Sequence, residues 1–583
     1  MLTTLQELSQ QFYAAIKAAF PEFDFAPHTV EITPSTQDKF GHYQFNGAMK
    51  LAGLLKKKPR EVAEAIVAQL NSGSLKHGLI DKLDIAGPGF INIWLKPDYL
   101  AQRLQTMLSS PHLAIAEVKP KQKIIIDFSS PNTAKEMHVG HLRSTIIGDC
   151  LSHLFEFLGY DVLRLNHIGD WGTAFGMLIA YLKENAPAVL AGTEKTDLTH
   201  LVNWYRESKK QFDADSDFKK RSQLEVVAIQ SGNPASIQAW EIICDISRKA
   251  YQEIYDLLDV EIIERGESFY NPLLADIVAD LEKKKLITLS DGAKCIFIEG
   301  FANREGDLLP LIVQKSDGGY NYATTDLAAI RHRIQDEKAD RLIYITDAGQ
   351  ATHFAMIFKA AELAGYLDSS KVVVNHVPFG LVLGADGKKF KTRSGDTERL
   401  IDLLTTAITE AKRILMEREV DMGEQQLTET AEVLGINAIK YADLSSNRTS
   451  DYVFSYDRML RFEGNTAAFL MYSYVRINGI KRKVGVDIAS IKEALELKHP
   501  SEIALAIHLD QFAMTLDQMT KDLSPHRLTE YLYNLAERFN AFFRDCRVEG
   551  DPAQNSRLLL CETAAQVMRQ GFYILGLKPL ERM

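Results

Sequence analysis

The sequence has few cysteines and no pair of them at a spacing that binds metal. They are scattered without a C-x-x-C pair, so neither a disulfide framework nor a structural zinc site is indicated: Cys150, Cys244, Cys295, Cys546 and Cys561. No apolar run approaches the roughly 18–20 residues that span a bilayer. Residues 1–12 are polar and amphipathic and lack a signal-peptide core. These absences predict a soluble, reduced, cytoplasmic protein without a membrane partner.

An excess of basic charge is also lacking, because the formal net charge is −10. A partner bound purely through phosphates calls for a basic field, so the net charge argues against that class of protein. Local basic clusters do occur, at residues 56–60, 388–393 and 481–483. A single cluster of this kind is typical of a solvated face, so charge alone assigns no partner.

Three regions follow one another along a chain that is too long for a single core. Residues 1–118 mix helical and strand patterns and predict a small α+β domain, which ends near a Pro/Lys-rich stretch. Residues 119–420 alternate strand-length apolar runs with helical patterns, which predicts a doubly wound parallel α/β sheet of the Rossmann type with insertions. Helical periodicity dominates afterwards, so residues 421–583 are predicted to be α-helical.

Short apolar runs define the strands of the expected sheet. Residues 123–128 form a continuous apolar run, as expected for a strand that is covered on both faces. Apolar residues then repeat every four positions from Leu142 to Leu158, with Gly159 at the expected end, which predicts a helix that begins near His138. The other strand candidates lie at residues 162–166, 295–299, 311–315, 342–346 and 372–377.

The stretch between the first strand and this helix reads D-F-S-S-P-N-T-A-K-E-M-H-V-G-H-L-R (127–143). In an open α/β sheet, ligands bind beyond the carboxyl ends of the strands, and a helix N-terminus there attracts anions. His138 and His141 are expected to project from the first turn, and Gly140 would let a flat group approach the backbone. We therefore predict that this turn binds the phosphates of a nucleotide triphosphate.

Two other kinds of site do not fit this stretch. A zinc site would need H-E-x-x-H spacing and a third ligand nearby, so no metal ligand is predicted. A Walker A loop is absent, because the pair Gly387-Lys388 lacks the upstream glycine and the following Ser or Thr. Two histidines at a helix start are as often structural as functional, but the length of the motif at the ligand-binding edge favours phosphate binding.

At this point the residues resemble a known family. Residues 129–149 resemble the HIGH-motif region of class I aminoacyl-tRNA synthetases, in the form characteristic of arginyl-tRNA synthetases. Similar segments follow in the expected order, at residues 40–47, 87–93, 166–176, 317–329, 389–395, 441–454 and 580–583. The resemblance implies a ligase that uses ATP, with Mg²⁺, to activate L-arginine as arginyl-adenylate and then transfers arginine to tRNA(Arg). It also implies a monomer.

The resemblance implies roles at the ATP site. His138 and His141 would hold the phosphates and Gly140 would admit the adenosine. The second family signature, K-M-S-K-S, falls on residues 390–394 within the loop 388–395, and both of its lysines are replaced here. The loop residues expected to contact ATP are Lys388, Lys391 and Arg393. We hypothesise that Lys135, just before the histidines, and Lys391 together neutralise the phosphates.

The amino-acid pocket follows from the chemistry of a guanidinium, which is planar and offers five donors, so that a selective pocket needs carboxylates and fixed acceptors. Tyr322 and Asp326 match the family's pair that grips the arginine side chain. The positions that match the rest of the pocket are Asp127, Ser130, Asn132, His138 and Gln350. A lone Asp or Tyr would be interpreted as a cap or core residue, but all of these fall at strand ends or helix starts.

By resemblance, the helical domain reads the anticodon and the N-terminal domain touches the tRNA elbow. The candidate tRNA contacts are Tyr474, Arg476, Asn478 and Lys481, although core packing is an equally good interpretation of such tyrosines. Two rival functions remain open. A class I synthetase for cysteine or glutamate would need zinc-binding cysteines or basic pocket residues, which are lacking. A non-catalytic tRNA-binding relative is favoured only by the altered loop at residues 390–394.

Overall fold

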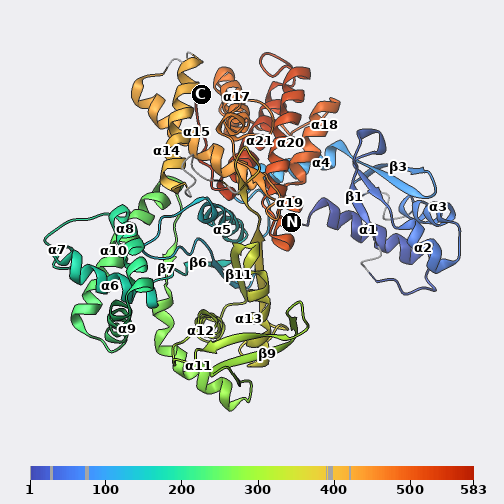
Figure 1. Cartoon of the computed structure of the whole chain (residues 1–583). Helices are drawn as coiled ribbons and strands as arrows, with labels where there is room; N and C mark the ends of the chain where they lie inside the picture. The colour runs from blue at the N-terminus through green and yellow to red at the C-terminus, as the bar shows by residue number, and fades with distance from the viewer. Residues whose placement is uncertain (1, 27–29, 73–77, 389, 391–397, 419–421) are drawn as a thin grey trace.

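A five-stranded parallel sheet lies in the middle of the molecule (Figure 1). The computed structural model describes residues 2–26, 30–72, 78–388, 390, 398–418 and 422–583. The sheet confirms the predicted doubly wound class, and its strand order is β12-β11-β5-β6-β7. The strands are β5 (Lys123–Asp127), β6 (Asp161–Asn166), β7 (Ile263–Glu264), β11 (Arg341–Asp347) and β12 (Val373–Phe379).

The middle of β5, residues 124–126, is apolar because both faces of the strand are covered. Ile124 and Ile126 belong to one hydrophobic core, which includes α5, whereas Ile125 belongs to a second core with α11, α12 and α13. The chain goes from β5 to β6 on one side and later to β11 on the other. The strand order therefore reverses between β5 and β11, which is where sheets of this class bind ligands.

Helices surround this sheet, and one group of them projects sideways (Figure 1). The projecting helices are α6 (Thr173–Asn185), α7 (Pro187–Leu190), α8 (Leu198–Ala214), α9 (Ser216–Gln230) and α10 (Pro234–Leu258). The others in this region are α5 (Val139–Phe157), η4 (Glu267–Tyr270), α11 (Asn271–Lys283), α12 (Tyr322–Gln335), η5 (Ala348–Gln350) and α13 (Ala351–Leu363). Gly159, just beyond α5, has a φ of +87°, as the predicted helix end requires.

Two of the predicted strands form a separate sheet, which corrects their assignment to the parallel one. Residues 295–299 and 311–315 fall in an antiparallel sheet of order β10-β9-β8. The physical reason is the short connection between them, since a parallel crossover needs about a dozen residues or more, whereas an antiparallel pair closes through a tight turn. The bounds are β8 (Thr288–Ser290), β9 (Ala293–Ala302) and β10 (Leu308–Gln314).

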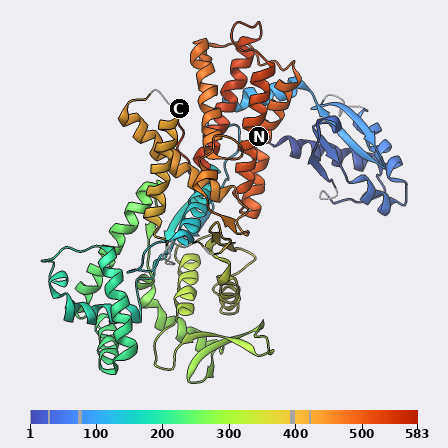
Figure 2. The same cartoon turned by 45° about the horizontal axis from the view of Figure 1, so that its top comes forward.

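The N-terminal region is an antiparallel sheet with helices packed against it, and it stands to one side of the molecule (Figures 1 and 2). The sheet order is β1-β2-β4-β3. The elements are α1 (Thr4–Ala19), β1 (Ile32–Pro34), η2 (Asp38–Phe40), β2 (Tyr43–Phe45), α2 (Ala48–Leu55), α3 (Pro59–Leu70), β3 (Ile80–Ala86), β4 (Phe90–Leu95) and α4 (Pro97–Leu108). Helix α4 contacts α18 and α21 of the C-terminal region and so joins the two.

The C-terminal region is helical, as its periodicity predicts. The two short strands and the helices are β13 (Val382–Leu383), α14 (Leu400–Glu417), α15 (Glu424–Leu444), β14 (Tyr452–Val453), α16 (Tyr456–Met459), α17 (Ala467–Val484), η6 (Ile488–Ser490), α18 (Pro500–Asp510), α19 (Phe512–Asp522), α20 (His526–Asp545) and α21 (Gln554–Ile574). None of the described helices combines the length and apolarity that crossing a membrane requires.

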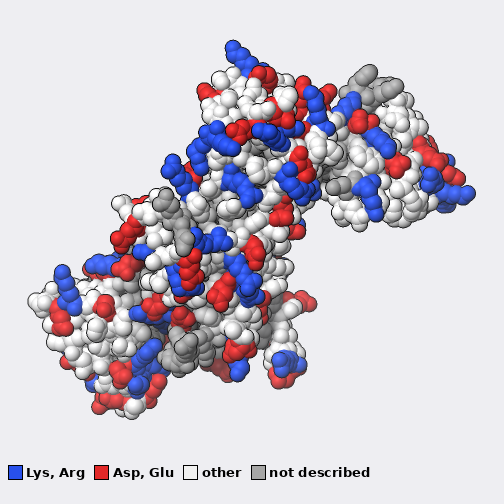
Figure 3. Space-filling model, turned by 90° about the horizontal axis from the view of Figure 1, so that it is seen from above, with Lys and Arg blue, Asp and Glu red and all other residues white. Residues whose placement is uncertain are grey.

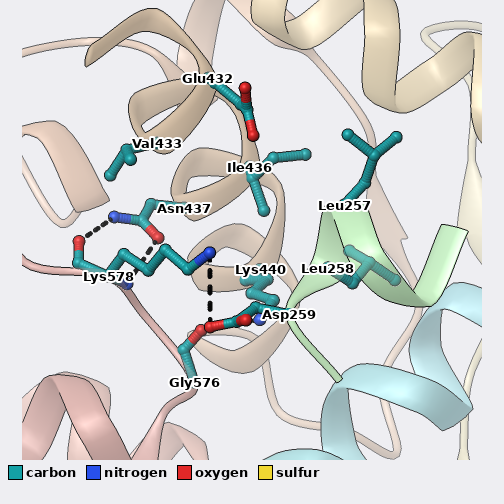
Figure 4. A pocket seen from close by; sticks show the side chains of 10 residues that line it. All are labelled: Leu257, Leu258, Asp259, Glu432, Val433, Ile436, Asn437, Lys440, Gly576 and Lys578. Carbon is teal, nitrogen blue, oxygen red and sulfur yellow. Dashed lines mark hydrogen bonds and ion pairs between the residues drawn. The ribbon is translucent and has the colours of Figure 1, made fainter. Parts of the chain in front are cut away.

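Residues 576–578 return to α15 and the end of α10, where they border a small hollow of about 30 Å³ (Figure 4). The buried Lys440 amine donates to the carbonyl of Gly576 at 2.7 Å, and burial lowers the pKa of Lys440. The side-chain amide of Asn437 donates to the carbonyl of Lys578 at 2.7 Å and accepts from the backbone amide of Lys578 at 3.1 Å. The C-terminal segment is therefore fastened to α15.

Candidate active site

The turn between β5 and α5 is held in a strained conformation. Ser129 and Ser130 have φ values of +68° and +49°, which residues other than glycine rarely adopt. Their backbone amides donate to Ser144 Oγ and Asn166 Oδ1, each at 2.9 Å, and the Ser129 hydroxyl lies 2.7 Å from that of Tyr255. Strain that neighbours hold in place in this way clusters at ligand-binding sites.

The two histidines cap the start of α5. His138 is the N-cap rather than a first-turn residue, and its Nδ1 accepts from the amide of Gly140 at 3.1 Å. The Nδ1 of His141 accepts from the amide of His138, also at 3.1 Å, and the two rings lie 4.1 Å apart. Because both Nδ1 atoms accept, the neutral rings carry their proton on Nε2. Burial, followed by the nearby His138 and Lys135, lowers the pKa of His141 to about 3.

The ring of His138 leaves no room for a side chain at Gly140. A Cβ at this position would lie 2.9 Å from Cε1 of His138, so any side chain would displace the imidazole. Two other predicted residues, Asn132 and Lys135, have exposed side chains, and their carbonyls both accept from the Tyr251 hydroxyl at 2.7 Å. The Asn132 side chain fills the space beside Gly169, where a Cβ would lie 2.1 Å from Oδ1.

The predicted arginine-binding residues are gathered at the carboxyl ends of β5 and β11. Asp127 ends β5, accepts from the Ser130 hydroxyl at 3.0 Å and pairs with the buried Arg333 of α12 at 2.8 Å. That ion pair fixes α12, whose first turns carry Tyr322 and Asp326, against the end of β5. The prediction thus names residues that the fold places at one edge of the sheet.

The starts of α12 and α13 face each other. His353 Nε2 lies 2.6 Å from Asp326 Oδ2, and its ring is 5.0 Å from that of Tyr322, which is 61% exposed. Gln350, at the end of η5, is exposed one turn before His353. The sequence patterns did not lead to His353. Its position at a helix start, three residues after the predicted pocket residue Gln350, could have indicated it.

A second residue missed from the sequence is Glu267, at the start of η4. Burial, followed by the nearby Asp326 and Asp170, raises the pKa of Glu267 to about 7. Its amide donates to the carbonyl of Ile168 at 3.0 Å, which attaches η4 to the segment after β6. Among the described residues its carboxylate has no hydrogen-bond or ion-pair partner. A partly buried carboxylate of this kind is a candidate contact for a cation.

Together these groups place several carboxyl side chains close to one another near the carboxyl ends of β5 and β6. The carboxylates are Asp127, Asp170, Glu267 and Asp326, and the buried Arg333 pairs with the first of them. His167 lies among them, and burial lowers its pKa, so it adds no positive charge at neutral pH. The edge of the sheet therefore combines a cluster of carboxylates, suited to a guanidinium, with two Nε2–H donors at a helix N-terminus, suited to phosphates.

Part of the predicted ATP site lies outside the described residues, namely Lys391 and Arg393. Lys388 is exposed, and its carbonyl accepts from the amide of Gly384 at 2.8 Å. Within the part of the chain that the structure describes, no group of three or more His, Cys, Asp or Glu side chains is placed to hold a metal ion.

The candidate tRNA contacts on α17 separate into buried and accessible residues. Tyr474 is fully buried and its hydroxyl accepts from Arg569 at 3.0 Å, so it is a core residue without surface for RNA. Asn478 is 6% exposed, and Lys481 is paired with Glu562. Arg476, in contrast, reaches the surface.

The side chain of Arg476 lies over the exposed ring of Tyr472 at 4.8 Å and donates to Asn540 at 3.0 Å. This combination of a guanidinium and an aromatic ring can stack on an unpaired base. Over the face shown in Figure 3, basic and acidic side chains are interspersed, with several Lys and Arg gathered along its middle.

Comparisons with known proteins show which family this chain resembles. Residues 103–456 match the family described as "tRNA synthetases class I (R), catalytic domain", residues 470–583 match "DALR anticodon binding domain", and residues 6–95 match "Arginyl tRNA synthetase N terminal domain". The chain is 64% identical to the arginine–tRNA ligase of Protochlamydia amoebophila and 52% identical to that of Chlamydia abortus, over the full length of each chain.

Similarity to a solved structure leads to the same family. The fold matches the crystal structure of Plasmodium falciparum arginyl-tRNA synthetase with a TM-score of 0.86, at 33% identity and 99% coverage of both chains. With family matches over most of its length and relatives of this identity, the chain belongs to the arginyl-tRNA synthetases, within the class I aminoacyl-tRNA synthetases.

Proposed function

We propose that this protein activates L-arginine with ATP and transfers the arginyl group to tRNA(Arg). The observation that carries the proposal is the adjacency, at the β5–β11 switch point, of a cluster of carboxylates that would form the arginine pocket and a helix N-terminus capped by two histidines. The pocket suits a guanidinium and the helix start suits the phosphates of ATP. The partners are therefore arginine, ATP and tRNA(Arg).

The first step is an in-line displacement at phosphorus. A carboxylate oxygen of arginine bonds to the α-phosphorus of ATP, and the bond to the β-phosphate oxygen breaks and releases pyrophosphate. Such a reaction asks the protein for positioning and for donors where negative charge develops. The Nε2–H groups of His138 and His141 are such donors, because their Nδ1 atoms are already occupied by backbone amides.

The second step transfers the arginyl group to RNA. A hydroxyl of the terminal ribose of tRNA(Arg) attacks the carbonyl carbon of arginyl-adenylate, and AMP leaves. Mg²⁺ would accompany the nucleotide, because it usually keeps several waters and binds to substrate phosphates rather than to an all-protein cage.

The guanidinium of the substrate would lie between Asp326 and Glu267, beside the ring of Tyr322. Ser130, Asn132 and Gln350 would contact the α-amino and carboxylate groups. Lysine and citrulline would leave one of these partly buried carboxylates without the guanidinium, and pockets built around such hydrogen bonds reject such analogues by about 10⁴–10⁵-fold. Lys388, Lys391 and Arg393 would complete the ATP site, and Lys135 would share the neutralisation of the phosphates.

For the whole molecule, we propose a division into an N-terminal domain of residues 1–118, a catalytic domain of residues 119–420 and a helical domain of residues 421–583. The helical domain would contact the anticodon, with Arg476 and Tyr472 as its accessible candidates, and the N-terminal domain would contact the tRNA elbow. We also propose that the protein works as a cytoplasmic monomer.

The test is ATP–pyrophosphate exchange with and without tRNA(Arg), with arginine, cysteine, glutamate and lysine as substrates. Exchange with arginine alone among the four is the expected result. A requirement for tRNA would indicate that bound tRNA completes the site. Exchange with another amino acid would indicate a different amino-acid specificity. Binding of tRNA without any exchange would favour a non-catalytic role.

A further inference from the structure

Residues 441–454, the segment Y-A-D-L-S-S-N-R-T-S-D-Y-V-F, have no role in the proposed function so far, yet they contact the chain just before the signature loop. We propose that Arg143 on α5, together with this segment, is a positioning device that holds residues 378–383 against α5 and thereby sets the ATP site. We name residues 378–383 the loop root. The proposal rests on the proposed function, since it concerns the ATP-binding half of that site.

Arg143 connects three parts of the molecule at one point. Its guanidinium is fully buried and donates to the carbonyl of Gly380 at 2.8 Å and to that of Ser450 at 3.3 Å. Its Nε lies 3.0 Å from the buried carboxylate of Asp443 on α15, and it packs 5.1 Å from the ring of Tyr452. A buried ion pair of this kind is costly to break from one side, because the remaining charge is left without a partner.

The same segment holds the loop root at further positions. Arg448 donates to the carbonyl of Pro378 at 2.8 Å, and Asp451 accepts from the amide of Leu381 at 2.6 Å. Next to them, β13 pairs in parallel with β14. The loop root is therefore bonded to residues 448–453 along most of its length, and Arg143 is the group that ties this unit to α5.

The chain that returns from the signature loop is also attached to the start of α5. The amide of Leu400 donates to the carbonyl of Met137 at 2.8 Å, and Arg399 forms an antiparallel bridge with His138. The described residues on both sides of the signature loop are thus fastened to the element that carries the two histidines. A displacement at Arg143 would shift one of these attachments relative to His138 and His141, and a 1 Å misplacement can cost about 10²-fold in rate.

A purely structural role would give a different result, and the chain offers a matched comparison. Asp149, on the same helix, is paired at 2.8 Å with Arg164 of β6, and both side chains are largely buried. That pair also stabilises α5, but it makes no contact with the loop root. The arginine pocket on α12, α13 and η4 is likewise outside the contacts of Arg143. A defect in the position of the loop root should therefore weaken the binding of ATP and leave the binding of arginine unchanged.

The experiment compares Arg143→Lys and Arg448→Lys with the control Arg164→Lys in the full-length protein. Pyrophosphate exchange gives kcat and the KM for ATP, calorimetry gives the Kd values for ATP–Mg²⁺ and for arginine, and thermal unfolding gives Tm. Because Arg448 is only partly buried, its variant keeps the test available if Arg143→Lys does not fold.

We expect Arg143→Lys to lower kcat/KM for ATP by about 10²-fold and to weaken ATP binding, with the Kd for arginine unchanged. Arg164→Lys should lower Tm without this loss. An equal loss in the control, or a parallel weakening of arginine binding, would overturn the proposal. If the unaltered protein shows no arginine-dependent exchange either with or without tRNA(Arg), the proposed function fails, and the Kd for ATP in the variants still decides whether the loop root is positioned in this way.

Discussion

Glu267 changes its charge near neutral pH, and that change should be visible in arginine binding. Its pKa is raised to about 7, chiefly by burial, so the carboxyl is partly protonated in the free enzyme at neutral pH. A guanidinium favours the ionised form. We expect arginine affinity to rise between about pH 6 and pH 8 and binding to release a proton. Calorimetry in two buffers of different ionisation enthalpy measures both effects.

The control for this prediction is Glu267→Gln, which keeps the shape of the side chain but does not titrate. Its Kd for arginine should rise by about 10- to 100-fold, since a hydrogen bond to a charged group contributes about 1.5–3 kcal/mol. The pH dependence should disappear with it. The expected effect of pH on folding stability has the opposite sign. Because the pKa of Glu267 is raised in the folded state, the protein becomes less stable as the pH rises through that pKa. If Glu267→Gln still released a proton on arginine binding, that proton would come from another group.

His141 offers a test of which ring nitrogen serves the phosphates. Its Nδ1 accepts from the His138 amide, and its low pKa keeps the ring neutral at working pH. Replacement by Gln places an amide near the Nε2 position, whereas Asn places one near Nδ1. His141→Asn should lower kcat by about 10²–10³-fold, the usual loss for one donor to a developing charge, and His141→Gln by less. Equal losses in the two variants would contradict the assignment of the donor.

Lys135 is the remaining residue for which the site makes a kinetic prediction. Its side chain is exposed beside the histidines, where its charge contributes to the low pKa of His141. A group that neutralises phosphates acts on the displacement step and not on the arginine pocket. Lys135→Ala should therefore lower kcat in pyrophosphate exchange far more than it raises the KM for arginine. The reverse pattern would place Lys135 in the amino-acid pocket.

At the scale of elements, the close contact of α5 with the strand below it should be sensitive to a single methyl group. A Cβ on Gly148 would lie 2.1 Å from Cγ of Phe128, which follows β5. Gly148→Ala must push the helix away from the sheet and should cost about 1–3 kcal/mol in unfolding free energy. Gly53→Ala on α2 is the matched control, since its Cβ meets nothing within 4 Å and a helical alanine is favourable. Denaturant unfolding of the two variants should give opposite signs.

The elements also show what the sequence could predict and where it failed. Helix α5 and strand β5 follow from local patterns, namely a four-residue apolar repeat that ends at Gly159 and a run with both faces buried. β9 and β10 pair in antiparallel fashion because a turn joins them. The apolar content of a strand does not reveal whether the strand is parallel or antiparallel. Glu267 and His353 were missed for another reason. Their importance comes from the approach of η4, α12 and α13 in space, which no local pattern encodes.

At the scale of the whole molecule, one buried cluster fixes the N-terminal region to the helical region. Asp510, at the end of α18, accepts from Arg103 of α4 and from Thr4 of α1, and both Arg103 and Asp510 are largely buried. Arg103 also donates to Glu7 at 3.2 Å. Two helices of the N-terminal region, α1 and α4, thus meet one carboxylate of α18.

Removal of that carboxylate charge should therefore release the N-terminal region without disturbing the chemistry. Asp510→Asn leaves Arg103 buried beside a neutral amide, and breaking a buried pair from one side costs about 3–5 kcal/mol. We expect a larger radius of gyration in X-ray scattering and a higher KM for tRNA, with Kd values for ATP and arginine unchanged. Asp517→Asn is the control, because its pair with Lys521 is exposed and contributes little. If Asp510→Asn kept both the compact scattering and the KM for tRNA, the apolar contacts of α4 with α18 and α21 would be sufficient to hold the N-terminal region in place.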